Sequence, residues 1–168
     1  IVISDITEAF AGSGFSIFAK AIEKGAVVRA IPAPGANGRP RSFFDKMNDW
    51  ARSEGAAGLG YIKFADGEGS GPIAKNLDAN RQKMIRELAG VGDGDAVFFA
   101  CDKASGAANL AGLARTKLGD DLEILEADVF RFCWITDFPM FEFDETEKKL
   151  DFSHNPFSMP QGGLDALN

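Results

Sequence analysis

The sequence predicts an α+β protein: a two-layer domain with a mixed or antiparallel sheet and helices on one face, followed by part of a second, antiparallel sheet. Over residues 1–119, strand-like apolar runs alternate with amphipathic helical patterns. After about residue 125 the helical patterns stop and strand-like segments follow one another. The 168 residues include 15 Phe, and 45% are hydrophobic, so the chain can bury a real core.

The helices are predicted from N-cap residues and from apolar side chains at helical spacing. We expect helices to begin at Asp5, Ser42 and Asp78, the first two with capping boxes closed by Glu8 and Asp45. A last helix is expected from the apolar spacing of residues 110–118. The side chains expected to face inward from the second and third helices are Phe43, Phe44, Met47, Trp50, Met84, Ile85 and Leu88.

The strands are predicted from alternating or continuous apolar runs between turn residues. Such runs occupy residues 15–19, 27–31, 59–64 and 96–100, and residues 66–72 are expected to form a loop. Residues 130–136 are apolar on both faces, so the pattern indicates a strand that needs a partner layer. Two further apolar segments, 138–143 and 150–152, flank a polar turn and predict a hairpin.

The charge is concentrated in one segment. The net charge of −7 divides into +2 over residues 1–119, −8 over 120–151 and −1 over 152–168. Neither part has the basic excess of an autonomous nucleic-acid binder, and we expect no DNA partner. No apolar run is long enough for a membrane helix, so no membrane partner is expected. Two Cys and one His make neither a disulfide framework nor a zinc site, which favours a reducing, cytosolic location.

Several motifs do not match known sites. The Gly-rich residues 66–71 lack the Gly-Lys-Ser/Thr of a phosphate-binding P-loop, and Gly12-Ser13-Gly14 lacks the spacing of a dinucleotide fingerprint. Asp93 and Asp95 miss the calcium-loop pattern, so we predict no metal site. Arg39 and Arg41, beside a loop rich in Pro and Gly, are candidates for contact with phosphate or with another protein.

The most informative motifs lie near the C-terminal end. They read WITDFPMFE over residues 134–142 and HNPFSMP over 154–160, and they include His154, the single imidazole of the chain. No nucleophile, base and orienting group stand together there. The two motifs resemble those of bacterial-type aspartyl-tRNA synthetases, which carry a similar strand followed by a similar loop.

The preceding body of the chain resembles the GAD domain that is inserted in the same family. The similar pieces are VRA at 28–30 with PG at 34–35, GAAGLGYIK at 55–63 and GPIAK at 71–75. GAD domains also occur in tRNA-dependent amidotransferase subunits, so this part alone leaves both families open. A free-standing GAD-type module that binds tRNA or a protein is a third alternative. The DFPMFE and HNPF motifs favour the synthetase.

The resemblance implies a cytoplasmic class II enzyme, a homodimer that activates L-aspartate with ATP and Mg²⁺ and transfers it to tRNA. Residues 1–14 would be a catalytic-domain connection, 15–125 the GAD insertion, and 126–168 catalytic-domain strands and the loop before motif 3. Because the arginines of motifs 2 and 3 have no counterpart here, we expect a fragment of a longer enzyme that is inactive alone and binds neither ATP nor Mg²⁺.

The resemblance also assigns residues. His154 matches an aspartate-binding His of the family, whereas Asn155 departs from the commoner second His. Asp137, Phe138 and Asn155 are possible walls of the amino-acid pocket, and Arg39 and Arg41 are possible contacts to tRNA or a partner. No catalytic residue is expected within the chain.

Overall fold

The computed structural model describes residues 1–136, 139–144 and 146–153 of the chain. The chain divides into two compact units, Ile1–Glu126 and Ala127–Asn168. The first unit contains a sheet covered by helices, and the second contains a two-stranded antiparallel sheet. The predicted α+β class with antiparallel sheets is therefore confirmed.

The sheet of the first unit has five strands in the order β1-β2-β5-β3-β4, and every neighbouring pair is antiparallel. The strands are β1 (Ser4–Asp5), β2 (Val27–Ala33), β3 (Gly60–Ala65), β4 (Glu68–Ser70) and β5 (Ala96–Asp102). The longest pairing joins β2 to β5, from Val27 opposite Asp102 to Ala33 opposite Ala96. Strands that are far apart in the sequence therefore form the centre of the sheet.

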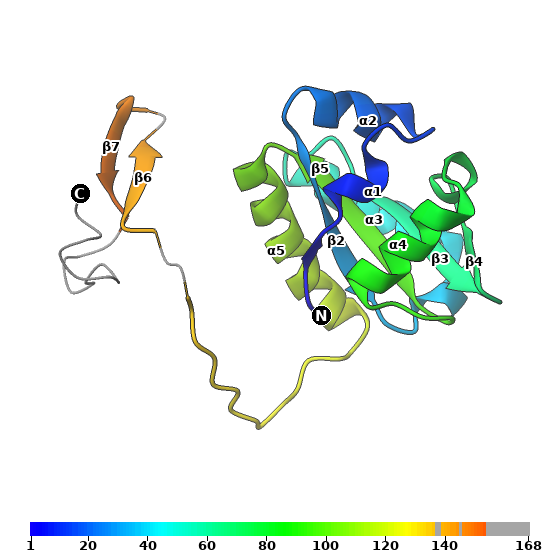
Figure 1. Ribbon diagram of the computed structural model, residues 1–168. Coiled ribbons are helices and arrows are strands. Elements are labelled where there is room, and N and C mark those ends of the chain that lie inside the picture. The colour runs from blue at the N-terminus through cyan, green and yellow to red at the C-terminus, as the bar shows by residue number, and fades with distance from the viewer. Residues whose placement is uncertain (137–138, 145, 154–168) are drawn as a thin grey trace. The chain divides into compact units, whose positions relative to one another are not determined.

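Helices cover both faces of this sheet (Figure 1). The helices are α1 (Thr7–Phe10), α2 (Ser16–Glu23), α3 (Arg41–Ser53), α4 (Ala79–Ala89) and α5 (Ala104–Asp121), with short 3₁₀ turns η1 (Ala36–Gly38) and η2 (Ala74–Asn76). One core lies between the sheet and α1, α2 and α4, and a second core lies between the sheet and α3 and α5.

The predicted two-layer arrangement with helices on one face is therefore wrong. Residues 96–100 of β5 are all buried, so side chains on both faces of this strand are removed from water. Val97 and Phe99 belong to one core, whereas Phe98 and Ala100 belong to the other. A central strand that is buried on both faces needs a helical layer on each side.

The strand predicted over residues 15–19 is also wrong, because these residues enter α2. Phe15, Phe18 and Ile22 follow helical spacing and pack against the first core. Ile17, which an alternating strand would place with Phe15, is 68% exposed. The aromatic residues Phe10, Phe15, Phe18 and Phe99 form a cluster of edge-to-face ring pairs that holds α2 against the sheet.

Of the three predicted N-caps, one is confirmed. Asp78 caps α4, since its Oδ1 accepts a hydrogen bond from the Arg81 N–H at 2.9 Å. Asp5 instead ends β1, and its Oδ1 accepts from the Thr7 N–H at the start of the one-turn helix α1. Ser42 lies inside α3, where Pro40 is the N-cap and no side chain caps the helix.

Two smaller expectations change as well. Leu88 was expected to face inward from α4 but is 45% exposed, whereas Ile85 is fully buried. The expected loop over residues 66–72 contains the edge strand β4, in which Gly69 lies opposite Phe64. A turn at Asp66 and Gly67, both with positive φ, joins β3 to β4.

The second unit contains the predicted hairpin, formed by β6 (Phe141–Asp144) and β7 (Lys149–Phe152). Its register places four apolar side chains on one face: Phe141, Phe143, Leu150 and Phe152, which are 51–72% exposed. Residues 130–136 form no strand, and Phe132 and Trp134 are 97% and 94% exposed. The expected strand is wrong for this chain, because strand hydrogen bonds need a neighbouring strand.

Candidate functional site

Arg39 lies on the loop that connects the end of β2 to α3, and Arg41 is the first residue of α3. The loop is held by hydrogen bonds to β3 and to the turn before β5. The Gly35 N–H donates to Asp95 Oδ1 at 2.9 Å, and the Asn37 N–H donates to the Gly94 carbonyl at 3.0 Å. Lys63 Nζ of β3 donates to the Asn37 carbonyl at 3.1 Å. The two arginines are therefore presented from a well-anchored backbone.

The two arginines differ in their surroundings. The guanidinium of Arg39 lies 5.6 Å from the ring centroid of Phe43 and donates to the Asp121 carbonyl near the end of α5. The side chain of Arg41 is 86% exposed and lies 3.5 Å from the carboxylate of Asp45. Both residues are exposed, so both are accessible to an anionic partner.

The remaining predicted site residues, Asp137, Phe138, His154 and Asn155, lie outside the described residues. The structure therefore leaves their predicted roles untested. Close to them in sequence, the described hairpin β6–β7 carries a polar face opposite its apolar one, with Glu142, Asp144, Lys149 and Asp151.

A groove of about 800 Å³, which the sequence did not indicate, lies between β4 and α4. Its lining includes Gly67–Gly69 on one side and residues of α4, among them Lys83, Arg86 and Glu87, on the other. Arg86 pairs with Asp93 at 3.0 Å, and Lys83 lies 3.8 Å from Glu87. The groove thus carries charges of both signs that already pair with each other. The signal that could have indicated it is the spacing of glycines 67, 69 and 71, since a strand glycine can mark a close approach of backbone to a neighbour.

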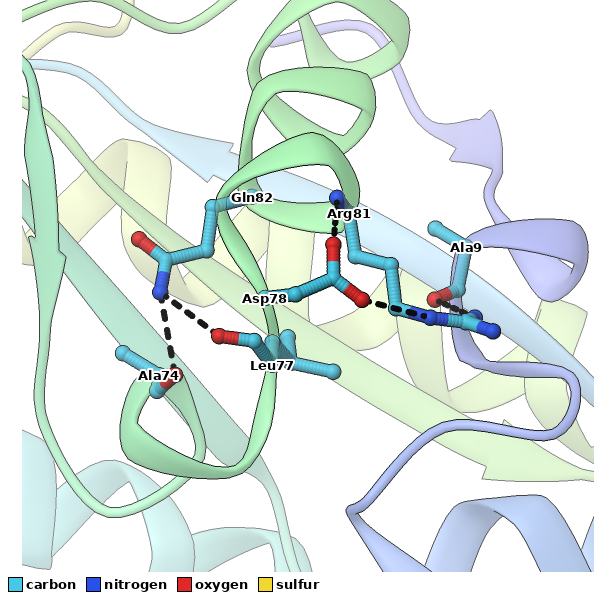
Figure 2. A network of polar contacts seen from close by, with 6 residues as sticks. All are labelled: Ala9, Ala74, Leu77, Asp78, Arg81 and Gln82. Atoms are coloured by element: carbon cyan, nitrogen blue, oxygen red, sulfur yellow. Dashed lines mark hydrogen bonds and ion pairs between the residues drawn. The ribbon is translucent and has the colours of Figure 1, made fainter.

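Gln82 joins α4 to three backbone groups, one in β4 and two in the segment before α4. Its Oε1 accepts from the Gly69 N–H of β4 at 2.9 Å. Its Nε2 donates to the carbonyls of Ala74 and Leu77 at 3.0 and 3.1 Å (Figure 2). The outward N–H of the edge strand is therefore satisfied from within the unit.

Few ionisable groups of the described residues are shifted. Burial raises the pKa of Asp5, but hydrogen bonds from Thr7 and the charge of Arg29 outweigh burial and hold the pKa of Asp5 below its usual value. Burial and the neighbouring Asp102 raise the pKa of the Cys101 thiol, which disfavours the reactive thiolate.

Within residues 1–136, 139–144 and 146–153, no three His, Cys, Asp or Glu side chains gather as metal ligands. Among those residues there is also no helix with the length and apolarity needed to cross a membrane.

Comparison with known proteins gives a consistent result. Residues 18–111 match the family model of the GAD domain. The chain is 65% identical over 167 residues to the aspartate–tRNA(Asp/Asn) ligase of Paramagnetospirillum magneticum, covering 99% of this chain and 19% of that protein. It is 62% and 57% identical over 168 residues to the proteins of the same name from Acidiphilium cryptum and Gluconobacter oxydans, covering all of this chain and 28% of each relative. The chain thus spans about a fifth to a quarter of the length of these relatives.

Proposed function

The chain belongs to the GAD domain family, and from this premise we propose that it is a segment of an aspartate–tRNA ligase: the GAD domain together with the catalytic-domain strands that flank it. The observation that carries the proposal is the extent of the similarity. The identity of 65% runs over 99% of the chain, so it includes both structural units and not only the matched residues 18–111. The three relatives described above bear the ligase name, so a free-standing GAD module or an amidotransferase subunit is not favoured.

We assign residues 1–14 to the connection from the catalytic domain, 15–125 to the GAD insertion and 126–168 to catalytic-domain strands. Support for the later boundary comes from the division into compact units at Glu126 and Ala127. The amphipathic hairpin β6–β7 and the exposed apolar residues 129–135 fit strands that are covered by another layer in the longer protein.

The full-length protein, in this proposal, is a cytoplasmic class II homodimer that uses ATP and Mg²⁺ to activate L-aspartate and then esterifies tRNA. The names of the relatives include both tRNA(Asp) and tRNA(Asn), and we propose both as substrates. The described residues hold no carboxylate cluster suited to Mg²⁺, so we derive no step through the metal. His154 would donate a ring N–H to the aspartate substrate and orient it.

The test is aspartate-dependent exchange of pyrophosphate into ATP, measured on the full-length protein and on residues 1–168 alone. We expect exchange by the full-length protein, charging of both tRNAs, and no exchange by the isolated segment. Exchange that depends on another amino acid, or activity of the isolated segment, would contradict the proposal.

In the full-length protein, His154→Ala should raise the KM for aspartate more than the KM for ATP, whereas the hairpin-turn control Thr146→Ala should leave both unchanged.

Arg39 and Arg41 are proposed to contact tRNA. Their positions support this, because Arg39 lies at the end of an anchored loop, Arg41 begins α3, and both side chains are exposed. Replacing both with Ala should raise the KM for tRNA at low salt and weaken its salt dependence. The control is Lys83→Ala on α4, which lies on the opposite face of the sheet. An unchanged KM for tRNA would exclude the contact.

A further inference from the structure

The segment that leads into the first unit is built into its core, although it precedes the residues 18–111 that match the family model. Strand β1 pairs with β2, with Ser4 opposite Ala30 and Asp5 opposite Arg29. Ile6 and Phe10 are 1% and 0% exposed. The ring of Phe10 lies 5.0 Å from that of Phe18 and 5.2 Å from that of Phe99. This segment cannot leave the sheet without exposing apolar side chains to water.

Polar contacts fasten the same segment to β2. The Ile6 N–H donates to the Val28 carbonyl at 3.0 Å, and the Val28 N–H donates to Thr7 Oγ1 at 2.9 Å. The Asp5 carboxylate accepts from the Thr7 N–H at 2.9 Å and from Arg29 Nη1 at 2.6 Å. Together these bonds link three successive residues of the segment to two successive residues of a central strand.

A further contact holds the far end of α1. Arg81 Nη1, from the first turn of α4, donates to the Ala9 carbonyl at 2.8 Å, while its Nε lies 3.4 Å from the N-cap Asp78 (Figure 2). Ile3, which precedes β1, packs against the opposite core. The incoming segment is thus held on both faces of the sheet and at both of its ends.

The segment that leaves the unit is held differently. After α5, Leu122 packs against the second core, and the Ile124 N–H donates to the Gly119 carbonyl at 3.0 Å. Residues 123–136 then lie in neither a helix nor a strand. The side chains of Val129 and Phe130 are 50% and 88% exposed. No strand pairing ties this segment to the sheet comparable to that of β1.

We propose that the first unit is attached asymmetrically: residues 4–10 are a rigid strut that moves as one body with strand β2, and any reorientation of the unit takes place outside residues 1–126, since Ile1 and Ile3 also pack against the second core. A displacement of the chain ahead of β1 is then transmitted directly to β2, which pairs with β5 along its whole length. This inference concerns the chain itself and does not rest on the ligase activity.

Hydrogen exchange of the full 168-residue chain, resolved by residue, tests the strut. Because one opening exposes both groups, the amides of Ile6 and Val28 should exchange at rates within about tenfold of each other. Residues 127–136 should exchange much faster. Exchange of Ile6 near the rate of an unprotected amide, with Val28 still protected, would overturn the proposal, since the segment would then open independently of the sheet.

A variant makes the test independent of the absolute rates. Asp5→Asn keeps an oxygen for the Thr7 N–H but removes the charge that attracts Arg29. Exchange of Ile6 and Val28 should rise together by about two- to fivefold, the effect of losing one partly exposed ion pair. The control, Asp45→Asn, removes the exposed pair with Arg41 on α3 and should leave both amides unchanged. A rise at Ile6 alone, or at neither amide, would contradict the strut.

Discussion

Gln82 shows how one polar side chain can satisfy a backbone N–H at the edge of a sheet. Edge strands expose backbone groups that can pair with another chain. In this unit the Gly69 N–H of β4 is bonded to Gln82, which also binds two carbonyls of the segment before α4. The side chain therefore fixes the relative positions of β4, η2 and α4, the elements beside the groove.

Gln82→Ala should lower the free energy of unfolding by about 2 kcal/mol, because a partly buried N–H and two carbonyls lose their partner. Lys83→Ala is the control. The Lys83 side chain is next to Gln82 in the sequence and is 75% exposed, and its ion pair with Glu87, at 3.8 Å, is a weak one. Chemical denaturation followed by circular dichroism measures both variants. Equal midpoints for the two variants would show that Gln82 contributes little.

Asp5 should make the first unit sensitive to acid. Although burial raises it, the pKa of Asp5 is lowered overall by the bonds from Thr7 and the charge of Arg29. The folded chain thus binds this proton more weakly than the unfolded chain, so the carboxylate stabilises the fold above a pH of about 4 and this stabilisation is lost as pH falls through the lower folded value. The stability difference between the unaltered chain and Asp5→Asn should shrink between about pH 6 and about pH 2. A difference that is independent of pH would contradict this.

At the scale of elements, the turn between α1 and α2 depends on a close approach. A Cβ placed on Gly14 would lie 2.6 Å from the backbone oxygen of Asn76, whose position η2 fixes. Because a backbone atom cannot rotate away as a side chain can, the two segments would have to separate.

Gly14→Ala should therefore destabilise the unit by about 1–3 kcal/mol, the usual effect of overpacking. The control is Gly38→Ala, where an added Cβ meets nothing within 4 Å. Thermal unfolding of the two variants measures the difference. If both variants melt at the same temperature, the space beside Asn76 is larger than the structure indicates.

The elements that could be predicted from the sequence are those determined by residues close to them in the chain. The α4 cap at Asp78 and the β6–β7 hairpin are determined by neighbouring residues, and both predictions are confirmed. Residues 15–19 fit an alternating pattern and a helical one, and contact with Phe10 and Phe99 decides for the helix. Strand β4 has no strand-forming composition and exists through its pairing with β3.

At the scale of the whole molecule, the buried apolar core among the described residues lies between Ile6 and Leu118, entirely within the first unit. We therefore expect a chain that ends at Glu126 to fold and to keep its melting temperature within about 2 °C of that of the full chain. Differential scanning calorimetry would measure this. A clearly lower melting temperature would show that residues 127–168 stabilise the sheet.

The candidate site, like the fold, could be predicted from the sequence only in part. Arg39 and Arg41 could be named as candidates because charge beside a Pro- and Gly-rich loop is visible in the sequence, and their contact with tRNA stays a prediction. The groove was missed because its two walls, β4 and α4, meet through tertiary contacts. The role of His154 came from resemblance to a family, and it stays a prediction. The helical layers on both faces were missed, although the continuous apolar run 96–100 is the pattern of a strand that is buried on both faces.

The order of the strands also affects folding during synthesis on the ribosome. Strand β2 has its longest pairing with β5, and Val27 meets Asp102, so the centre of the sheet forms only after the chain through β5 has emerged. At about 5–20 residues per second, the 75 residues that separate these partners take about 4–15 s to synthesise. During that time β2 can pair with β1, which precedes it, but the edge of β2 that will face β5 has no partner strand.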